Sequence, residues 1–161
     1  MSTFTLFHVA LSLVGILAGF VASFGLLASK LCRISTPVFL WTTLATVVTG
    51  FFFPFHGFTP AIGLGIISLP VLAAAFYALY AGKLAGNWRW VYVICAVLAL
   101  YFNFFVLIVQ SFQKIPALNA LAPTQKEPPF AIAQGAALLL FVVLGILAIS
   151  RFRPQPAGPV S

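Results

Sequence analysis

Long apolar runs, separated by short polar or proline-containing connections, dominate the pattern along this chain. Five runs are long enough to consider as membrane crossings: 4–28, 37–53, 60–81, 90–111 and 130–150. A helix needs about 20 apolar residues to cross about 30 Å of hydrocarbon, and inside lipid only a helix satisfies its own backbone. The pattern therefore predicts an all-α integral membrane protein, a bundle of five transmembrane helices.

The predicted spans leave room for one transmembrane domain, over residues 1–153, and a disordered tail, over 154–161. The second run is the shortest, because Pro54 closes it. Threonines recur along this second run, and a threonine in a helix can return its hydroxyl to the carbonyl one turn back. We therefore expect burial of these hydroxyls in lipid to cost little free energy. The alternative is that they line a polar seam between helices.

The longest connection, 112–129, is expected to cap the outer ends of the helices. Ile115, Leu118 and Leu121 recur at a spacing of three between prolines, and one or two amphipathic turns lying on the membrane would bury them. An ordered cover and a lid over a pocket both fit this pattern.

Lys and Arg gather at alternate connections, and this sets the predicted orientation. Short cytoplasmic loops of multi-pass proteins carry an excess of basic residues. Five spans bring six basic residues to one side and two to the other, so we expect the N-terminus outside and the C-terminus in the cytoplasm. The six are Lys30, Arg33, Lys83, Arg89, Arg151 and Arg153, and the two are Lys114 and Lys126.

Composition excludes several classes of protein. Charged residues make up only 6% of the 161 residues, and a single acidic residue, Glu127, stands against eight Lys and Arg. The net charge of +7 does not predict nucleic-acid binding, because the basic residues form no stripe. The two cysteines, Cys32 and Cys95, form no motif and are expected to be small buried hydrophobes.

Small residues form one stripe along the first predicted helix. Ser12, Gly15, Gly19 and Ala22 are spaced three, four and three apart, which suits close contact between helices. Packing within this chain and contact with another subunit are both consistent with the stripe.

Polar side chains within the spans gather toward the predicted outer side, and four amides are candidate ligand contacts. Asn103 lies deepest, and its amide is costly to leave unpaired in hydrocarbon. A hydrogen bond to a neighbouring helix is one interpretation, and contact with a quinone or lipid headgroup is the other. The four candidates are Asn103, Gln110, Gln113 and Gln134.

The two histidines, His8 and His56, are also placed toward the outer side. Two imidazoles facing each other can hold a b-type haem, so haem or another metal is one hypothesis for this pair. The alternative is that both are plain interfacial residues.

No set of residues predicts catalysis. The chain has no Asp, and its one Glu lies outside the spans, so a carboxylate relay within the membrane is not available. There is also no glycine-rich phosphate loop and no metal-spaced cluster of Cys and His.

The chain resembles a family of small, uncharacterised bacterial inner-membrane proteins. The resemblance lies in residues 41–55, in WRWVY at 88–92, in QSFQKIPALNALAPTQ at 110–125 and in EPPF at 127–130. It implies a multi-pass protein of the bacterial inner membrane and brings no activity, cofactor or site residue with it.

Three functions are therefore considered from the sequence. The first is a non-catalytic accessory subunit, in contact with lipids and forming a homo-oligomer or part of a larger complex. The second is a module or small carrier that binds a lipid, a quinone or another apolar ligand. The third is a redox subunit that holds haem.

Overall fold

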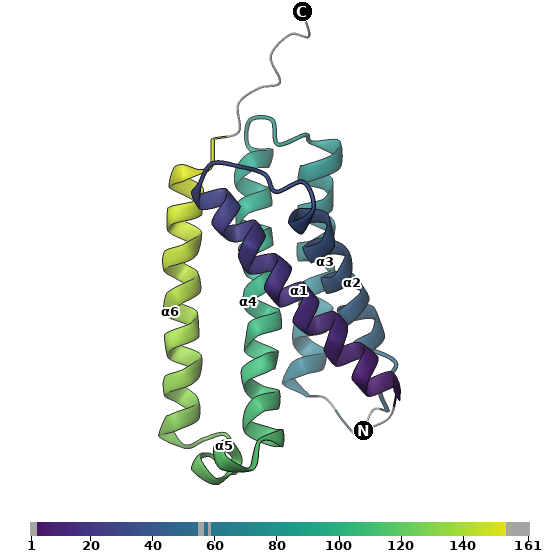
Figure 1. Cartoon of the computed structure of the whole chain (residues 1–161), viewed down its shortest axis with the longest axis vertical. Helices are drawn as coiled ribbons and strands as arrows, with labels where there is room; N and C mark the ends of the chain where they lie inside the picture. Colours follow the sequence, from purple (N-terminus) through teal and green to yellow (C-terminus); the bar gives the residue numbers. More distant parts are fainter. Residues whose placement is uncertain (1–2, 55–56, 58, 154–161) are drawn as a thin grey trace, which may run out of the picture.

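A computed structural model describes residues 3–54, 57 and 59–153 of the chain, and these residues form an all-helical bundle without strands (Figure 1). The prediction of an all-α protein is confirmed. The helices in chain order are α1 (Thr3–Leu27), α2 (Ser35–Gly50), α3 (Pro60–Phe76), the π-helical turn η1 (Tyr77–Ala81), α4 (Trp88–Lys114), α5 (Pro116–Leu121) and α6 (Pro128–Arg151). The expected disordered tail, 154–161, lies outside the described residues.

Within the part of the chain that the structure describes, four helical segments are long and apolar enough to cross a membrane: α1, α3 continued by η1, α4 and α6. α2 has only 16 residues, which gives about 24 Å at about 1.5 Å per residue. This is shorter than the hydrocarbon layer of about 30 Å. The structure therefore establishes four candidate spans, and the expected count of five depends on α2.

α4 is the central helix of the bundle. It contacts α1, α2, α3, α5 and α6, and in Figure 1 it runs between α6 on one side and α3 on the other. α1 crosses the bundle obliquely and packs mainly on α2 (Figure 1).

The hydrophobic core fills only one half of the bundle. Its members come from the second half of α1, the first half of α2, the end of α3, the first half of α4 and the second half of α6. These segments share the end of the molecule that lies away from α5 (Figure 1). Leu40, Leu72 and Leu100 are among the fully buried members.

The same end carries the six basic residues expected on one side, and we call it the basic end. Here the chain is held by contacts far apart in sequence. The Ser29 hydroxyl donates to the Arg153 carbonyl at 3.0 Å and accepts from the Arg153 amide at 2.8 Å. The Arg89 guanidinium donates to the Phe152 carbonyl and lies 4.4 Å from the centre of the Trp90 ring.

Two glycines let α1 approach its neighbours closely. A Cβ atom on Gly15 would lie 3.0 Å from Thr42 Oγ1, and one on Gly19 would lie 2.6 Å from Leu100 Cδ1 and 2.8 Å from Phe39 Cδ2. Ala22 is also buried. These members of the predicted stripe therefore pack against α2 and α4 of the same chain.

We expect Gly19→Ala to lower the free energy of unfolding by about 1–3 kcal/mol, the usual cost of overpacking a core. Gly135→Ala, on α6, is the matched control, because no atom lies within 4 Å of its added methyl. It should be neutral or stabilising by up to about 1 kcal/mol through helix propensity. Unfolding in mild detergent titrated with SDS measures both. Equal effects of the two changes would contradict the close packing at Gly19.

Candidate functional site

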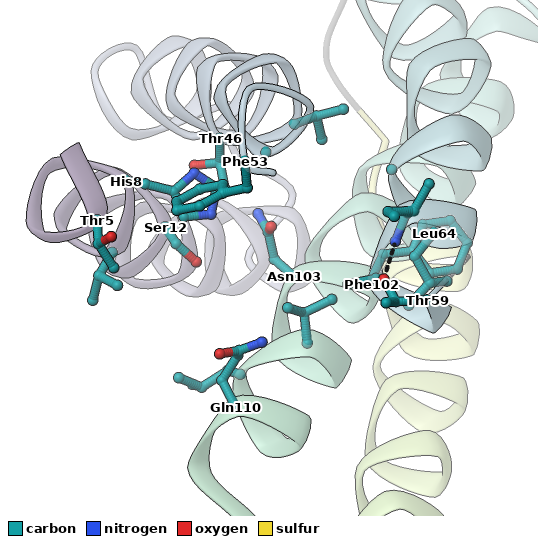
Figure 2. Close-up of a pocket in the computed structure, with 18 of the residues that line it drawn as sticks. Thr5, His8, Ser12, Thr46, Phe53, Thr59, Leu64, Phe102, Asn103 and Gln110 are labelled. Atoms are coloured by element: carbon teal, nitrogen blue, oxygen red, sulfur yellow. Dashed lines mark hydrogen bonds between the residues drawn. The ribbon is translucent and has the colours of Figure 1, made fainter. Parts of the chain in front are cut away.

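A cavity of about 580 Å³ occupies the half of the bundle that the core leaves unfilled. Its walls come from the first half of α1, the end of α2, the first half of α3 and the second half of α4 (Figure 2). Its volume lies within the range of about 300–1,000 Å³ that is typical of small-molecule sites. The exposed residues Pro54, Thr59 and Lys114 are part of its lining, so the cavity reaches the surface at the end of the molecule opposite the basic end.

Asn103 projects from α4 into the middle of this region (Figure 2). Its side chain is 9% exposed, and its Nδ2 donates to the Thr43 hydroxyl at 3.1 Å. One hydrogen bond between helices is therefore present, as one interpretation of the sequence expected. The amide has a second donor hydrogen and a carbonyl oxygen, and Asn103 also lines the cavity.

Most hydroxyl groups in the cavity wall are already bonded to their own helix. Thr46 donates to the Thr42 carbonyl at 2.8 Å, Ser68 to the Leu64 carbonyl at 2.6 Å, and Ser111 to the Leu107 carbonyl at 2.7 Å. The expected return of threonine hydroxyls to the preceding turn is thus confirmed at Thr46. These groups give the wall little free hydrogen-bonding capacity, so it is more apolar than its residue types suggest.

His8 is held in the wall by α2. Thr49 donates its hydroxyl to the Ala45 carbonyl at 2.7 Å, and the same oxygen lies 2.8 Å from His8 Nδ1. The imidazole and the Thr49 hydroxyl therefore form a hydrogen bond between α1 and α2. The imidazole also packs edge-on against Phe53, with ring centres 5.0 Å apart.

Gln110 and Ser12 are the uncharged polar wall residues without a hydrogen bond within the described part of the chain. Both are half-buried. In Figure 2, Ser12 of α1 lies to the left of Asn103 and Gln110 of α4 lies below it. Their amide and hydroxyl are therefore available to a molecule in the cavity. Ser12, expected to be a packing residue, also lines the cavity.

The four candidate amides separate into two groups. Asn103 and Gln110 line the cavity, whereas Gln113 and Gln134 do not. Gln113 is exposed on α4. Gln134 lies on α6, where its Nε2 donates to the Phe105 carbonyl at 3.3 Å and its buried Oε1 has no partner among the described residues.

The spacing of the polar residues along α4 indicates which of them share the side of the helix that faces the cavity. Asn103, Gln110 and Lys114 are seven and four residues apart, which places them on one face of the helix. This spacing would have added Lys114 to the predicted amides Asn103 and Gln110.

The predicted cap between α4 and α6 lies beside the cavity. It holds one short helix, α5 (Pro116–Leu121), and only Lys114 and Ile115 of the segment 112–129 belong to the lining. Asn119 Nδ2 donates to the Phe112 carbonyl at 3.1 Å, and Gln125 Nε2 to the Val109 carbonyl at 3.0 Å, so the segment is bonded to α4.

Glu127, the only acidic residue, is satisfied locally within this connection. Its Oε1 accepts from the Thr124 hydroxyl at 2.8 Å and from the Thr124 amide at 3.2 Å, and its Oε2 accepts from the Lys126 amide at 3.1 Å. The Thr124 hydroxyl, together with these amides, holds the pKa of the Glu127 carboxyl below its usual range.

The described residues support neither a metal site nor a pair of haem ligands. No group of three or more His, Cys, Asp or Glu comes together in residues 3–54, 57 and 59–153. His8 is engaged by Thr49, and its proposed partner, His56, lies outside the described residues. Cys32 and Cys95 are half-buried free thiols, and neither belongs to the cavity lining.

A scan against protein-family models, a search of curated proteins and a search of solved structures each find no match to this chain. The functional argument therefore depends on the cavity itself.

Proposed function

We propose that this chain is a membrane protein that binds one small, largely apolar molecule, of the lipid or quinone class, in the cavity between α1, α2, α3 and α4. The observation that carries the proposal is the coincidence of an apolar space of about 580 Å³ with two half-buried, unpartnered polar groups, on Gln110 and Ser12. Small-molecule sites typically combine an apolar wall with a few polar groups that orient the ligand.

The character of the wall supports an apolar occupant. Removing apolar surface from water is favourable by about 25 cal/mol per Å². Water can fill the exposed mouth, but Val9, Phe102 and Leu107 in the wall offer it no hydrogen bonds, so an apolar group is the better occupant there.

The polar groups suit a ligand that has one hydrogen-bonding part and one apolar part. Amides such as those of Asn103 and Gln110 can donate to a carbonyl or ester oxygen and accept from a hydroxyl. The wall around them is apolar, because most of its hydroxyls are bonded to their own helices. Among the described residues of the cavity wall, none is arranged to break or form a covalent bond, so we propose binding or carriage of the ligand without catalysis.

We further propose that α2 completes a five-crossing topology in a bacterial inner membrane, with the N-terminus outside and the C-terminus in the cytoplasm. Figure 1 shows the start of α1 at the α5 end and the end of α6 at the opposite end, as an odd number of crossings requires. The excess of Lys and Arg at the basic end favours a cytoplasmic position for that end. The resemblance to bacterial inner-membrane proteins supports the location.

Labelling of single cysteines tests this topology. In a chain whose Cys32 and Cys95 are replaced by Ser, we expect a membrane-impermeant maleimide added to intact cells to label Lys126→Cys and to spare Lys30→Cys. Labelling of Lys30→Cys with protection of Lys126→Cys would reverse the orientation. Labelling of both would place residues 30 and 126 on the same side of the membrane and would contradict an odd number of crossings.

An accessory role in a larger complex is a second proposal, with weaker support. The stripe that suggested it is largely occupied inside the chain, because Gly15 and Gly19 contact α2 and α4. One observation still favours it: Gly135 on α6 is exposed and has no neighbour within 4 Å of an added Cβ, which would let another helix approach. A strictly monomeric protein in mild detergent would remove this role.

Filling the cavity tests ligand binding. We expect Val106→Trp, which adds bulk to the cavity wall, to reduce the small molecules that co-purify with the protein by at least about tenfold, equivalent to about 1.4 kcal/mol of affinity. Asn103→Leu should reduce them by about fivefold, the effect of losing one hydrogen bond of about 1 kcal/mol. Mass spectrometry of organic extracts of the purified protein measures both.

Val143→Trp is the matched control for bulk. Val143 is 46% exposed on α6 and lies outside the lining, so the same substitution there should leave the co-purified molecules unchanged. If the wild-type protein and Val106→Trp yield the same small molecules in the same amounts, the proposed function is contradicted.

A further inference from the structure

The charges around the cavity have one sign. Among the described residues that line it, the side chains that can carry a charge are those of His8 and Lys114, and the charged form of each is a cation. No acidic side chain lines the cavity, and the only acidic residue of the chain, Glu127, is bonded to Thr124 and to nearby amides. Lys114 therefore forms no ion pair among the described residues.

Helix dipoles do not change this sign. A helix carries about half a positive charge at its N-terminus and half a negative charge at its C-terminus. Of the four helices that line the cavity, α1 and α3 begin at this end of the bundle, while α2 and α4 end there (Figure 1). Two positive and two negative helix ends largely cancel, so the side chains determine the electrostatic preference of the mouth.

The length of α4 is compatible with a headgroup-level position for Lys114. α4 has 27 residues, or about 40 Å at about 1.5 Å per residue. A bilayer with its headgroup regions is about 40–45 Å thick, so a membrane crossed by the whole of α4 would bring its last residue to the level of the headgroups. From Lys114, the polar face of α4 continues inward past Gln110 to Asn103, over about 16 Å.

We propose that the ligand is an amphiphile with one apolar chain and an anionic headgroup, a carboxylate or a phosphate monoester, whose headgroup lies at the mouth beside Lys114, His8 and Gln110. This inference rests on the proposed function and narrows its ligand class. A charge-assisted hydrogen bond from an ammonium to a carboxylate or phosphate is stronger than a neutral one. The apolar chain then extends along Val106, Leu107 and Phe102 toward Asn103, where the wall carries no ionisable side chain.

The size of the cavity favours one chain. Its volume of about 580 Å³ is in the middle of the range for sites that hold one small molecule. The wall at its deep end is closed by packed residues, since Gly15 and Gly19 hold α1 against α2 and α4 there.

Radiolabelled oleate, bound to the purified full chain and measured by scintillation proximity, tests the inference. Unlabelled oleate and oleyl phosphate should displace it, while oleyl alcohol and oleylamine, which carry the same chain with a neutral and a cationic headgroup, should compete at least about tenfold more weakly. The order of oleate and oleyl phosphate then distinguishes a carboxylate from a phosphate ligand.

Two lysine variants separate a local contact from general charge. We expect Lys114→Gln to weaken oleate binding by about tenfold and to reduce the difference between oleate and oleyl alcohol. Lys126→Gln removes the same charge at the same end, outside the lining, and should leave affinity unchanged. Both side chains are exposed, so thermal unfolding of both variants should match the wild type.

Three results would overturn the inference: no binding of either anionic probe, equal competition by oleate and oleyl alcohol, or equal weakening by both lysine variants. If Val106→Trp still removes a co-purified molecule in any of these cases, the proposed function stands and only the anionic class is wrong. If Val106→Trp removes nothing, both fail.

Discussion

The close contact of α1 with α2 and α4 at Gly15 and Gly19 is the interaction on which the shape of the molecule depends. Lipid gives helices no hydrophobic driving force to associate, so contact in a membrane depends on close packing and on a few hydrogen bonds. At these two glycines the backbone of α1 comes within reach of Thr42, Phe39 and Leu100. Toward its N-terminus the same helix lies across the cavity from α4.

This crossing divides the bundle into two halves with different physical character. The half at the basic end is filled by interlocking apolar side chains, and its ends are held by Arg89 and Ser29. The other half contains the cavity, together with the buried Asn103–Thr43 hydrogen bond and the His8–Thr49 contact. A filled half stabilises the fold, and a hollow half with a few free polar groups can hold a ligand without disturbing it.

The sequence predicts the helices well because lipid imposes a single solution on each apolar run. Pro54 ends the second run early, and α2, with 16 residues, shows why the count of spans is harder to predict than the presence of helices. Polarity within apolar sequence also identified Asn103 and Gln110, since such groups are costly in a membrane and need partners.

The arrangement around the cavity was harder to predict, because depth in the membrane does not give the direction in which a side chain points. Gln113 and Gln134 lie at a predicted depth similar to that of Gln110. The Gln113 side chain is nevertheless exposed, and the Gln134 amide on α6 donates to the Phe105 carbonyl on α4. Apolar wall residues such as Ile62 and Leu64 cannot be told from residues that face lipid, because both environments favour the same side chains. Only the spacing of Asn103, Gln110 and Lys114 on one face of α4 carried part of this information.

The central claim is that the cavity holds one small amphiphile in the membrane. Native mass spectrometry of the protein, extracted from its own membranes in mild detergent, tests it most directly. The account predicts the mass of one 17.3 kDa chain plus that of a single small molecule, retained at low activation energy and released at higher energy. Bare chain at the lowest activation energy would contradict it, and a foreign polypeptide in place of a small ligand would favour the accessory role instead.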